Sequence, residues 1–356
     1  MTDFEGAIIS DQAALNAWVA ACAQSDPVAV DTEGDSLHCY REKLCLIQMS
    51  TAHATLLIDP LVRLDFGAFN AMLSARTVVL HGCDYDLRML RRGIQFAPGA
   101  VFDTYLGARL LGLKEVGLAS LVQRYFEVDL PKTSQKANWA RRPLTATMVS
   151  YAMNDTRYLL PMAERIGAQL RELGRWPWFE ESCARAVAAA SEDRERDPEK
   201  AWKVSGSSAL RGRALAVLRA LWFWREEEAE QADRPTFQIL RNEEMVDVAQ
   251  GATQGRMNLP HHLPTGRRKR LYATLHKALE LPENAWPQRE PVARARHTPE
   301  QEKRFEDLRQ QRDRIASELE LDPGVLAPRQ ALERLVREPE SVDAVLMGWQ
   351  RRLLGL

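Results

Sequence analysis

Two pairs of polar side chains are spaced so that each pair could meet a single ligand. Asp31 and Glu33 follow the short apolar run 28–30, and alternate residues of a β-strand project from the same face. Two carboxylates on one face repel each other unless a cation lies between them. Farther along, Tyr151 and Asp155 are four residues apart, which places both on one face of a helix. Either pattern also occurs by accident, so neither one alone defines a site.

A third acidic segment, HGCDYDLRML at 81–90, runs from an apolar strand into a predicted helix. Asp84 is well placed to be the N-cap residue, accepting a hydrogen bond from the backbone N–H of Asp86 or Leu87. Asp86 would gain only roughly a few tenths of a kcal/mol from the helix dipole, so its presence asks for another reason. The pattern itself leaves open which of the two acids is functional.

The elements that would position these acids lie in the first two hundred residues, where strand-like and helix-like runs alternate. The predicted strands are 28–30, 44–49, 55–59 and 77–82, and the predicted helices are 66–73, 84–92, 118–125 and about 145–173. This alternation predicts an α/β layer, a sheet covered by helices.

The rest of the chain is predicted to be helical. Segments 226–249 and 313–336 share one order of features, which is a helix, a proline-centred turn, an apolar pair and a second helix. We therefore predict two copies of a small helical module. The expected domains are residues 1–195, a linker at 196–208 that is rich in charge, Pro, Gly and Ser, and helical domains at 209–290 and 298–356.

The charge distribution shows where a polyanion could bind. The net charge of the 356 residues is −1, but residues 201–297 carry 16 basic and 11 acidic side chains. The densest basic cluster is 267–270, at the start of a helix-like run. A second basic segment, LPKTSQKANWARRP at 130–143, contains an aromatic residue and a proline near each end, which predicts an ordered functional loop or a mobile lid.

Cysteine usage and hydropathy indicate the compartment. The five cysteines are scattered without a CxxC pair, so neither a disulfide framework nor a structural zinc site is expected. No apolar run approaches the roughly 18 to 20 residues of a bilayer span, and the acidic start MTDFEGAIISD is unlike a signal peptide. We therefore expect a cytoplasmic protein with no membrane partner.

The order and flanks of the acidic motifs resemble the tyrosine branch of the DEDD exonuclease superfamily, and within it the ribonuclease D family. The matching residues are Asp31, Glu33, Asp86, Tyr151 and Asp155. The matching flanks are LCLIQM at 44–49, VFDTYLGARLLG at 101–112 and ANWARRPLTATMVSYAMNDTRYLLPM at 137–162. Residues 210–250 are similar to the HRDC domain, and 298–356 to a second, divergent copy.

The resemblance implies a fold and an activity. The expected fold is an α/β ribonuclease H-like exonuclease domain, with a mixed sheet and flanking helices, followed by two small all-α HRDC-like domains. The expected activity is that of a monomeric 3′–5′ exoribonuclease that releases nucleoside 5′-monophosphates. Its expected partner is RNA with a free 3′ end, above all precursor tRNA and other small structured RNAs.

The resemblance also implies a two-metal-ion site, because two hard divalent ions about 4 Å apart suit phosphodiester hydrolysis. Carboxylates suit Mg²⁺ or Mn²⁺, and no His or Cys cluster competes for the role. By resemblance, Asp31 bridges both ions, Glu33 and Asp155 complete the ion that activates water, and Asp86 holds the other. Tyr151 orients the water. The family pattern of Asp followed by an aliphatic residue favours Asp86 over Asp84.

Two basic segments are candidates for RNA binding once this resemblance is accepted. The candidates are Lys132, Gln135, Trp139, Arg141, Arg142, Arg267, Arg268, Lys269 and Arg270. Cations suit phosphates and an exposed ring suits an unpaired base, although the Trp139 ring could equally fold back on the core. Trp222 and Trp224 are expected to be core residues.

Three alternatives remain open at this stage. A DNA-directed exonuclease would carry the same acids, a catalytically inactive relative would only bind RNA or a protein, and the helical modules could be the sole functional part. The presence of all four acids and Tyr151 argues against an inactive protein. The sequence does not indicate which RNA is physiological or whether Mg²⁺ or Mn²⁺ is used.

Overall fold

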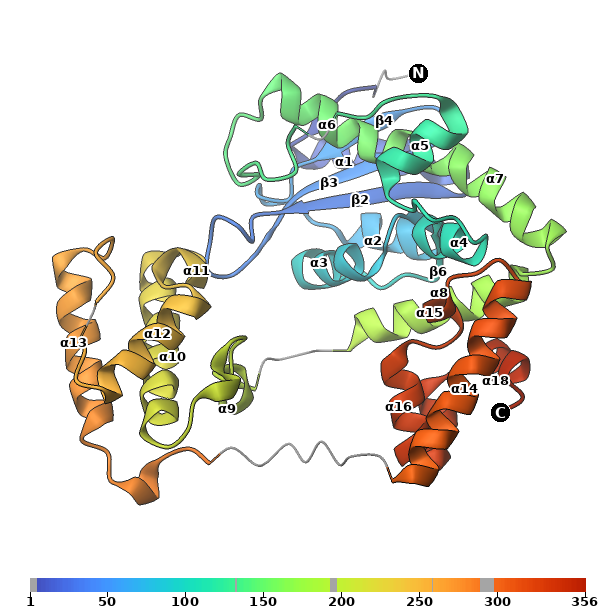
Figure 1. The fold of residues 1–356 in the computed structure, drawn as a ribbon. Coiled ribbons are helices and arrows are strands. Elements are labelled where there is room, and N and C mark those ends of the chain that lie inside the picture. The colour runs from blue at the N-terminus through green and yellow to red at the C-terminus, as the bar shows by residue number, and fades with distance from the viewer. Residues whose placement is uncertain (1–4, 132, 193–196, 258, 289–297) are drawn as a thin grey trace. The chain divides into compact units, whose positions relative to one another are not determined.

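The protein is described by a computed structural model that covers residues 5–131, 133–192, 197–257, 259–288 and 298–356 (Figure 1). The chain forms two compact units. The first comprises Met1–Gly34, Lys43–Asp193 and Arg296–Leu356, and the second comprises Asp35–Glu42 and Arg194–Ala295. Each unit has its own hydrophobic core.

A six-stranded mixed sheet is the centre of the first unit. Its strands are β1 (Ile8–Ile9), β2 (Val28–Gly34), β3 (Leu44–Ser50), β4 (Thr55–Ile58), β5 (Thr77–Leu80) and β6 (Ala100–Asp103). Their order in the sheet is β1-β4-β3-β2-β5-β6, with β3 antiparallel to both of its neighbours and the other pairs parallel. The predicted strands are present, and β2 continues through the acids at 31 and 33 instead of ending before them.

Helices cover both faces of this sheet, as the alternating pattern predicts. They are α1 (Gln12–Ala21), α2 (Gly67–Ser74), α3 (Asp84–Ile94), α4 (Thr104–Leu110), α5 (Leu118–Phe126), α6 (Ala146–Arg157), α7 (Leu159–Glu172) and α8 (Trp176–Ser191). Val28 and Val30 of β2 pack in a core with α1, α2 and α3. The intervening Ala29 packs in a core with α7. The residues of β2 therefore alternate between two buried faces, and α6 packs against β2, β3 and β4.

The long helical stretch expected at about 145–173 is two helices. Its first part, α6, begins at Thr145, whose side chain accepts a hydrogen bond from the Met148 N–H. Pro161 lies in the first turn of α7 and has no N–H to donate to the carbonyl of Arg157, so one continuous helix is unfavourable. The break separates the helix that faces the acids from the helix that packs in the main core.

The second unit is helical. Its α-helices are α9 (Pro198–Ala201), α10 (Arg213–Ala232), α11 (Thr236–Ile239), α12 (Asn242–Thr253) and α13 (Thr265–Leu279). Trp222 and Trp224 are buried in its core, as expected. Trp202, within the segment expected to be a linker, is buried in the same core.

The C-terminal helices repeat the order of α10, α11 and α12. They are α14 (Pro299–Glu318), α15 (Pro323–Leu326), α16 (Arg329–Arg337), α17 (Val342–Val345) and α18 (Gly348–Leu354). In each region a helix of 20 residues is followed by a helix of four residues. The third helix has 12 residues in α12 and 9 residues in α16. The similarity between segments 226–249 and 313–336 thus corresponds to the same order of helices in both.

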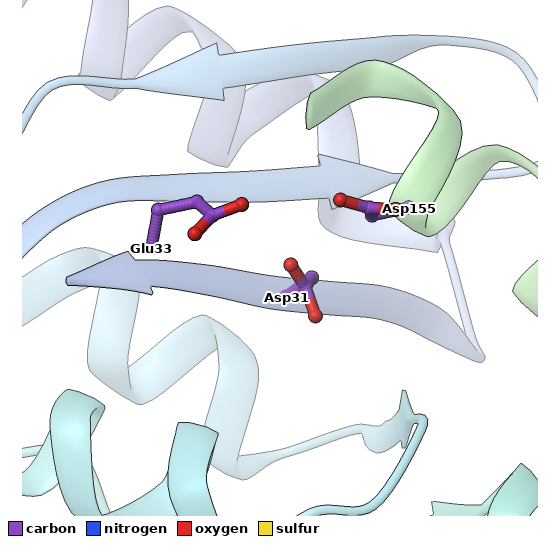
Figure 2. Close-up of side chains that lie close together, drawn as sticks. All are labelled: Asp31, Glu33 and Asp155. Atoms are coloured by element: carbon purple, nitrogen blue, oxygen red, sulfur yellow. The ribbon is translucent and has the colours of Figure 1, made fainter. Parts of the chain in front are cut away.

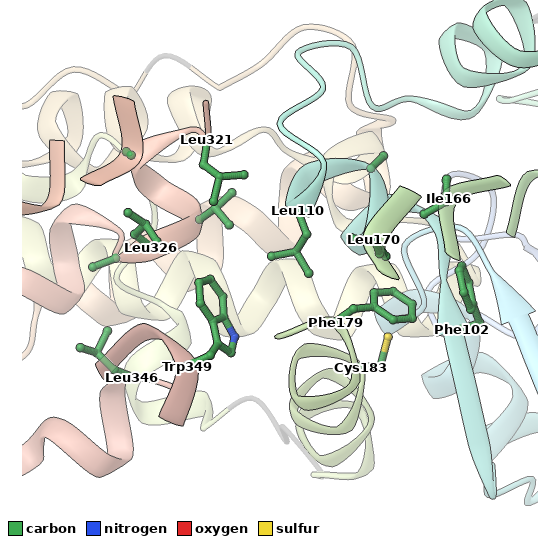
Figure 3. Packing of buried hydrophobic residues seen from close by; sticks show 14 of the residues in the cluster. Phe102, Leu110, Ile166, Leu170, Phe179, Cys183, Leu321, Leu326, Leu346 and Trp349 are labelled. Carbon is green, nitrogen blue, oxygen red and sulfur yellow. The ribbon is translucent and has the colours of Figure 1, made fainter. Parts of the chain in front are cut away.

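These C-terminal helices share one hydrophobic core with α4, α7 and α8 of the first unit (Figure 3). Trp349 of α18 stacks on Trp178 of α8, with ring centroids 5.0 Å apart and planes at 11°. The Glu181 carboxylate accepts hydrogen bonds from the backbone N–H groups of Gly348 and Trp349 at the start of α18. Apolar burial and a helix cap therefore both attach this region to α8.

Two further expectations concern the compartment. All five cysteines are buried free thiols, as their scattered positions suggested. Among the described helices, none combines the length and the apolar composition needed to span a bilayer.

Candidate active site

Asp31 and Glu33 project together from β2 toward the face covered by α6. In the antiparallel ladder Asp31 lies opposite Gln48 of β3 and Glu33 lies opposite Leu46, and the register shifts directly after Glu33. The shift coincides with the end of β2, where the chain leaves the sheet. Strand alternation therefore places two half-buried carboxylates side by side at the carboxyl end of β2, as their spacing predicts.

Asp155 approaches these two acids from α6 (Figure 2). One carboxylate oxygen from each of Asp31, Glu33 and Asp155 lies within 4.8 Å of the other two. Tyr151, one helical turn before Asp155, hydrogen-bonds the Asp155 carboxylate, and the Gln135 side chain hydrogen-bonds Tyr151. The spacing of four residues thus brings a phenol and a carboxylate to the same cluster.

Asp86 of α3 lines the same cleft, although the three oxygens that lie within 4.8 Å of one another do not include one from Asp86. It lies in the first turn of α3 with 5% of its surface exposed, and its Oδ1 accepts hydrogen bonds from Thr32 N at 3.0 Å and Thr32 Oγ1 at 2.6 Å. Thr32 was not among the expected site residues. The signal was present, because strand alternation turns Thr32 away from its two acidic neighbours and toward the face of α3.

Asp84 has a different role from the one expected. The N-cap residue of α3 is Cys83, whose side chain makes no capping hydrogen bond. Asp84 is the first residue of the helix, is exposed, and forms an ion pair with Arg88 one turn later at 2.9 Å. The N-cap expectation for Asp84 is therefore wrong, because the helix begins one residue earlier than that role requires.

The four carboxylates and Tyr151 line one cleft of about 400 Å³. Burial and mutual repulsion raise the pKa of Asp31 well above its usual range and the pKa of Glu33 to about 9. Burial also raises the pKa values of Asp86 and Asp155 to about 7, although hydrogen bonds from Thr32 and Tyr151 oppose that rise. Without a cation, the cluster thus holds protons that isolated carboxyls would lose.

His81 lines the same cleft with a defined tautomer. The Thr104 hydroxyl lies 3.0 Å from the carbonyl oxygen of Leu80 and 2.9 Å from His81 Nδ1. Because the hydroxyl gives its only proton to the carbonyl, it accepts from Nδ1–H. Burial lowers the pKa of His81, which favours the neutral ring. His81 was not among the expected site residues, although it begins the segment that carries Asp86.

The loop at 130–143 contributes fewer RNA contacts than expected. Gln135 lines the cleft, and Lys132 lies outside the described residues. The Trp139 ring is only 1% exposed and packs 6.1 Å from the Tyr151 ring, centroid to centroid. This burial contradicts the expectation that Trp139 stacks on an unpaired base. Its ring forms part of the wall behind Tyr151.

Arg142 is also a structural residue. Its Nε and Nη2 bind the carboxylate of the buried Asp59, and its Nη groups donate to the carbonyl oxygens of Trp139, Arg141 and Cys45. All three guanidinium nitrogens are therefore engaged within the protein, which contradicts a role as a phosphate contact. Arg141 is exposed.

The basic cluster 267–270 lies at the start of α13 in the second unit. Arg267 and Arg270 both pair with Glu228 of α10, whose side chain is 5% exposed. These two arginines neutralise a buried carboxylate, and their hydrogen bonds lower the pKa of Glu228. Arg268, Lys269 and Arg270 are all exposed, and Arg268 and Lys269 are the two members of the cluster that do not pair with Glu228.

The chemistry of the cluster fits divalent metal ions. Carboxylate oxygens are the ligands that Mg²⁺ and Mn²⁺ prefer, and the raised pKa values show that the acids are unfavourable together without positive charge. Among the described residues that line the cleft, His81 is the only one with a basic side chain, and its lowered pKa favours the neutral ring. The cluster is therefore suited to binding divalent cations.

Comparison with known proteins defines the class of enzyme. Residues 7–171 match the 3′-5′ exonuclease family model, and residues 214–258 match the HRDC domain model. The chain thus contains a 3′–5′ exonuclease domain followed by an HRDC domain, and the expected fold class is confirmed. Residues 7–171 contain all four acids and Tyr151.

Similar full-length proteins narrow this class to one family. The chain is 30% identical to ribonuclease D of Haemophilus influenzae, over 97% of this chain and 90% of the relative. It is 32% identical to ribonuclease D of Pseudomonas paraeruginosa, over 92% of this chain and 90% of the relative. The Escherichia coli RNase D structure matches with a TM-score of 0.76 and 26% identity, over 100% of this chain and 97% of that one. The chain belongs to the ribonuclease D family of 3′–5′ exoribonucleases, as the motifs suggested.

Proposed function

We propose that this exoribonuclease trims the 3′ ends of precursor tRNA and other small structured RNAs with two divalent ions, Mg²⁺ or Mn²⁺, held by Asp31, Glu33, Asp86 and Asp155. The observation that carries the proposal is the meeting of these four carboxylates and Tyr151 in one cleft. They come from β2, α3 and α6, and no other chain is needed to complete the set. We therefore propose that the monomer is active.

The bound ions supply positive charge to the attacked phosphate, an activated water and a stabilised leaving 3′ oxygen. The protein's task is to hold the ligands in place. Asp31 would help to hold both ions, Glu33 and Asp155 would help to hold the one that activates water, and Asp86 would help to hold the one that stabilises the leaving oxygen. The products are then nucleoside 5′-monophosphates.

Tyr151 is proposed to orient the attacking water. Burial and the neighbouring carboxylates raise its pKa above the usual value, so its hydroxyl keeps its proton and acts in hydrogen bonding instead of as a strong base. This hydroxyl interacts with the Asp155 carboxylate and the Gln135 side chain. Its role is thus positional, unlike that of the metal ligands.

This division of roles is tested by comparing Asp155→Asn with Tyr151→Phe. We expect Asp155→Asn to weaken Mn²⁺ binding and to lower kcat by about 10²- to 10³-fold, as loss of an electrostatic group does. Tyr151→Phe should lower kcat less and leave the calorimetric Mn²⁺ affinity within about twofold. Equal loss of metal affinity in both variants would contradict the proposed role of Tyr151.

Structured RNA is proposed as the substrate because the Escherichia coli RNase D structure, which this chain matches over its full length, is described as an exoribonuclease involved in structured RNA processing. Gln135 at the cleft and the exposed Arg141, Arg268 and Lys269 are the proposed RNA contacts. A tRNA substrate and five free thiols both favour action in the cytoplasm.

The substrate proposal is tested with a 5′-labelled precursor tRNA that carries a single-stranded 3′ extension. We expect stepwise shortening from the 3′ end that stops near the stem, release of nucleoside 5′-monophosphates, and dependence on added Mg²⁺ or Mn²⁺. Asp31→Asn is the inactive control. A DNA strand of equal length tests the DNA-directed alternative, and faster digestion of that DNA would overturn the assignment of RNA as substrate.

A further inference from the structure

Gln48 is a fully buried polar residue in the middle of β3. Its side chain is 0% exposed, and neither its Oε1 nor its Nε2 has a hydrogen-bond partner among the described residues. A buried amide without partners costs folding free energy, and most buried polar groups in proteins are paired. A residue that keeps such a group at the centre of a sheet therefore asks for a functional explanation.

The position of Gln48 connects it with the acidic cluster. In the antiparallel ladder Gln48 lies directly opposite Asp31, and residues in opposite positions project from the same face with Cβ atoms roughly 4.5–5.5 Å apart. On its other side Gln48 lies opposite the apolar Leu57 of β4. The helix α6, which carries Asp155, packs over this face of β3. The amide is thus within side-chain reach of the Asp31 carboxylate.

Neighbouring positions on the same face show that this site does not need a polar residue for packing. Leu46, two residues before Gln48, is buried and apolar. Ser50, two residues after it, is buried and polar, but its hydroxyl is hydrogen-bonded to Thr55 at 2.9 Å and to Thr156 at 2.7 Å. The face therefore accommodates either an apolar side chain or a fully paired polar one, and Gln48 is neither.

We propose that Gln48 is a positioning residue for the metal site, and that its Nε2 donates a hydrogen bond to the Asp31 carboxylate when Asp31 serves as a metal ligand. Groups that hydrogen-bond a metal-binding carboxylate limit its rotation and tune its affinity for the ion. The inference rests on the proposed role of Asp31 as a ligand. It adds that the strand next to β2 supplies the group that orients this ligand.

The test is Gln48→Met in the full-length chain, because methionine has similar length and no amide. Four quantities are measured: the Tm of the metal-free protein, the Mn²⁺ affinity by calorimetry, and kcat and KM on RNA. We expect the metal-free Tm to stay equal or rise, since an unpaired polar group is removed. The Mn²⁺ affinity should fall by about 10- to 100-fold. The kcat should fall while the KM for RNA stays unchanged.

Ser50→Ala is the matched control on the same strand and face. It removes a buried polar group that is already paired, so we expect a lower Tm and an unchanged Mn²⁺ affinity. A double variant completes the design. If Gln48 acts through Asp31, Gln48→Met should not lower the Mn²⁺ affinity further in an Asp31→Asn background.

Two outcomes for the Gln48→Met variant would overturn the inference. A folded Gln48→Met variant with unchanged Mn²⁺ affinity overturns it, and a variant that fails to fold without metal also does, because it would show that the amide serves the fold. Failure of the proposed function is recognised separately. In that case Asp31→Asn would itself retain Mn²⁺ binding and activity, whatever Gln48→Met does.

Discussion

The Thr32 hydroxyl lies 2.6 Å from Oδ1 of Asp86, and the backbone N–H of Thr32 donates to the same oxygen at 3.0 Å. These two contacts join β2 to α3 across 54 residues of sequence. They hold one oxygen of Asp86 and fix the direction of the other. Thr32 thus aligns an acid of α3 with the two acids that flank Thr32 itself in β2.

Loss of the Thr32 hydroxyl should lower the metal affinity of the site strongly and the free energy of unfolding only slightly. We expect Thr32→Val to lower Mn²⁺ affinity or activity by about 10- to 100-fold, the range for groups that orient metal ligands. The backbone contact remains, so the free energy of unfolding should fall by only about 1 kcal/mol. Calorimetric titration and chemical denaturation measure the two effects. Asp84→Ala is the control, because Asp84 is exposed and is not among the residues that line the cleft. An equal loss of metal affinity in both variants would contradict this role of Thr32.

The stability of the metal-free protein should fall as the pH rises. The pKa of Glu33 is raised to about 9, and the pKa values of Asp86 and Asp155 to about 7, mainly by burial. The folded state therefore binds more protons than the unfolded state, whose carboxyls titrate near about pH 4. Below about pH 4 both states are protonated and this stabilisation is fully present, and it is lost as the pH rises through about 7 to 9.

Thermal unfolding of the metal-free protein between about pH 5 and about pH 9 measures this effect. We expect the Tm to decline over that interval, and saturating Mn²⁺ should restore it at the alkaline end by replacing the lost protons. The Asp155→Asn variant should show a weaker decline. A metal-free Tm that is constant or rises over the same interval would show that the acids do not share the environment described.

The two neighbouring arginines of the 130–143 loop should separate stability from RNA binding. Arg142→Ala leaves the buried Asp59 carboxylate without its partner, which we expect to cost about 3–5 kcal/mol of unfolding free energy. Arg141→Ala should leave stability within about 0.5 kcal/mol. It should instead raise the KM for RNA. Denaturant melts and steady-state kinetics on both variants check this, and an unchanged stability of Arg142→Ala would show that its ion pair is dispensable.

The C-terminal helices should stabilise the exonuclease core. Trp349 is 1% exposed and stacked on Trp178, so Trp349→Ala removes a large buried ring and should cost about 3–5 kcal/mol. Because the core is shared, Trp349→Ala should also lower the temperature at which exonuclease activity is lost. An unchanged inactivation temperature would show that the C-terminal helices fold independently of the exonuclease core. Leu356→Ala is a control for an exposed apolar residue of the same region.

Short-range patterns in the sequence determined much of this protein. Strand alternation alone places Asp31 and Glu33 on one face, and helical spacing alone places Tyr151 beside Asp155, because both depend only on local backbone geometry. The interleaving of apolar strands and helices also predicts the α/β layer. The one local error in the acidic motifs, the N-cap assigned to Asp84, is an error of a single residue in the start of α3.

Only the tertiary structure decided what the isolated side chains do. Trp139 and Arg142 read as nucleic-acid contacts by residue type, yet one is buried behind Tyr151 and the other neutralises Asp59. Burial and pairing depend on residues distant in sequence, so composition does not reveal them. Strand alternation predicts the direction of the Thr32 side chain, but only the fold shows that its partner is Asp86. The core that α18 shares with α8 is likewise decided by the fold. Each arises because the folded chain removes specific groups from water together, and no local pattern records which groups those are.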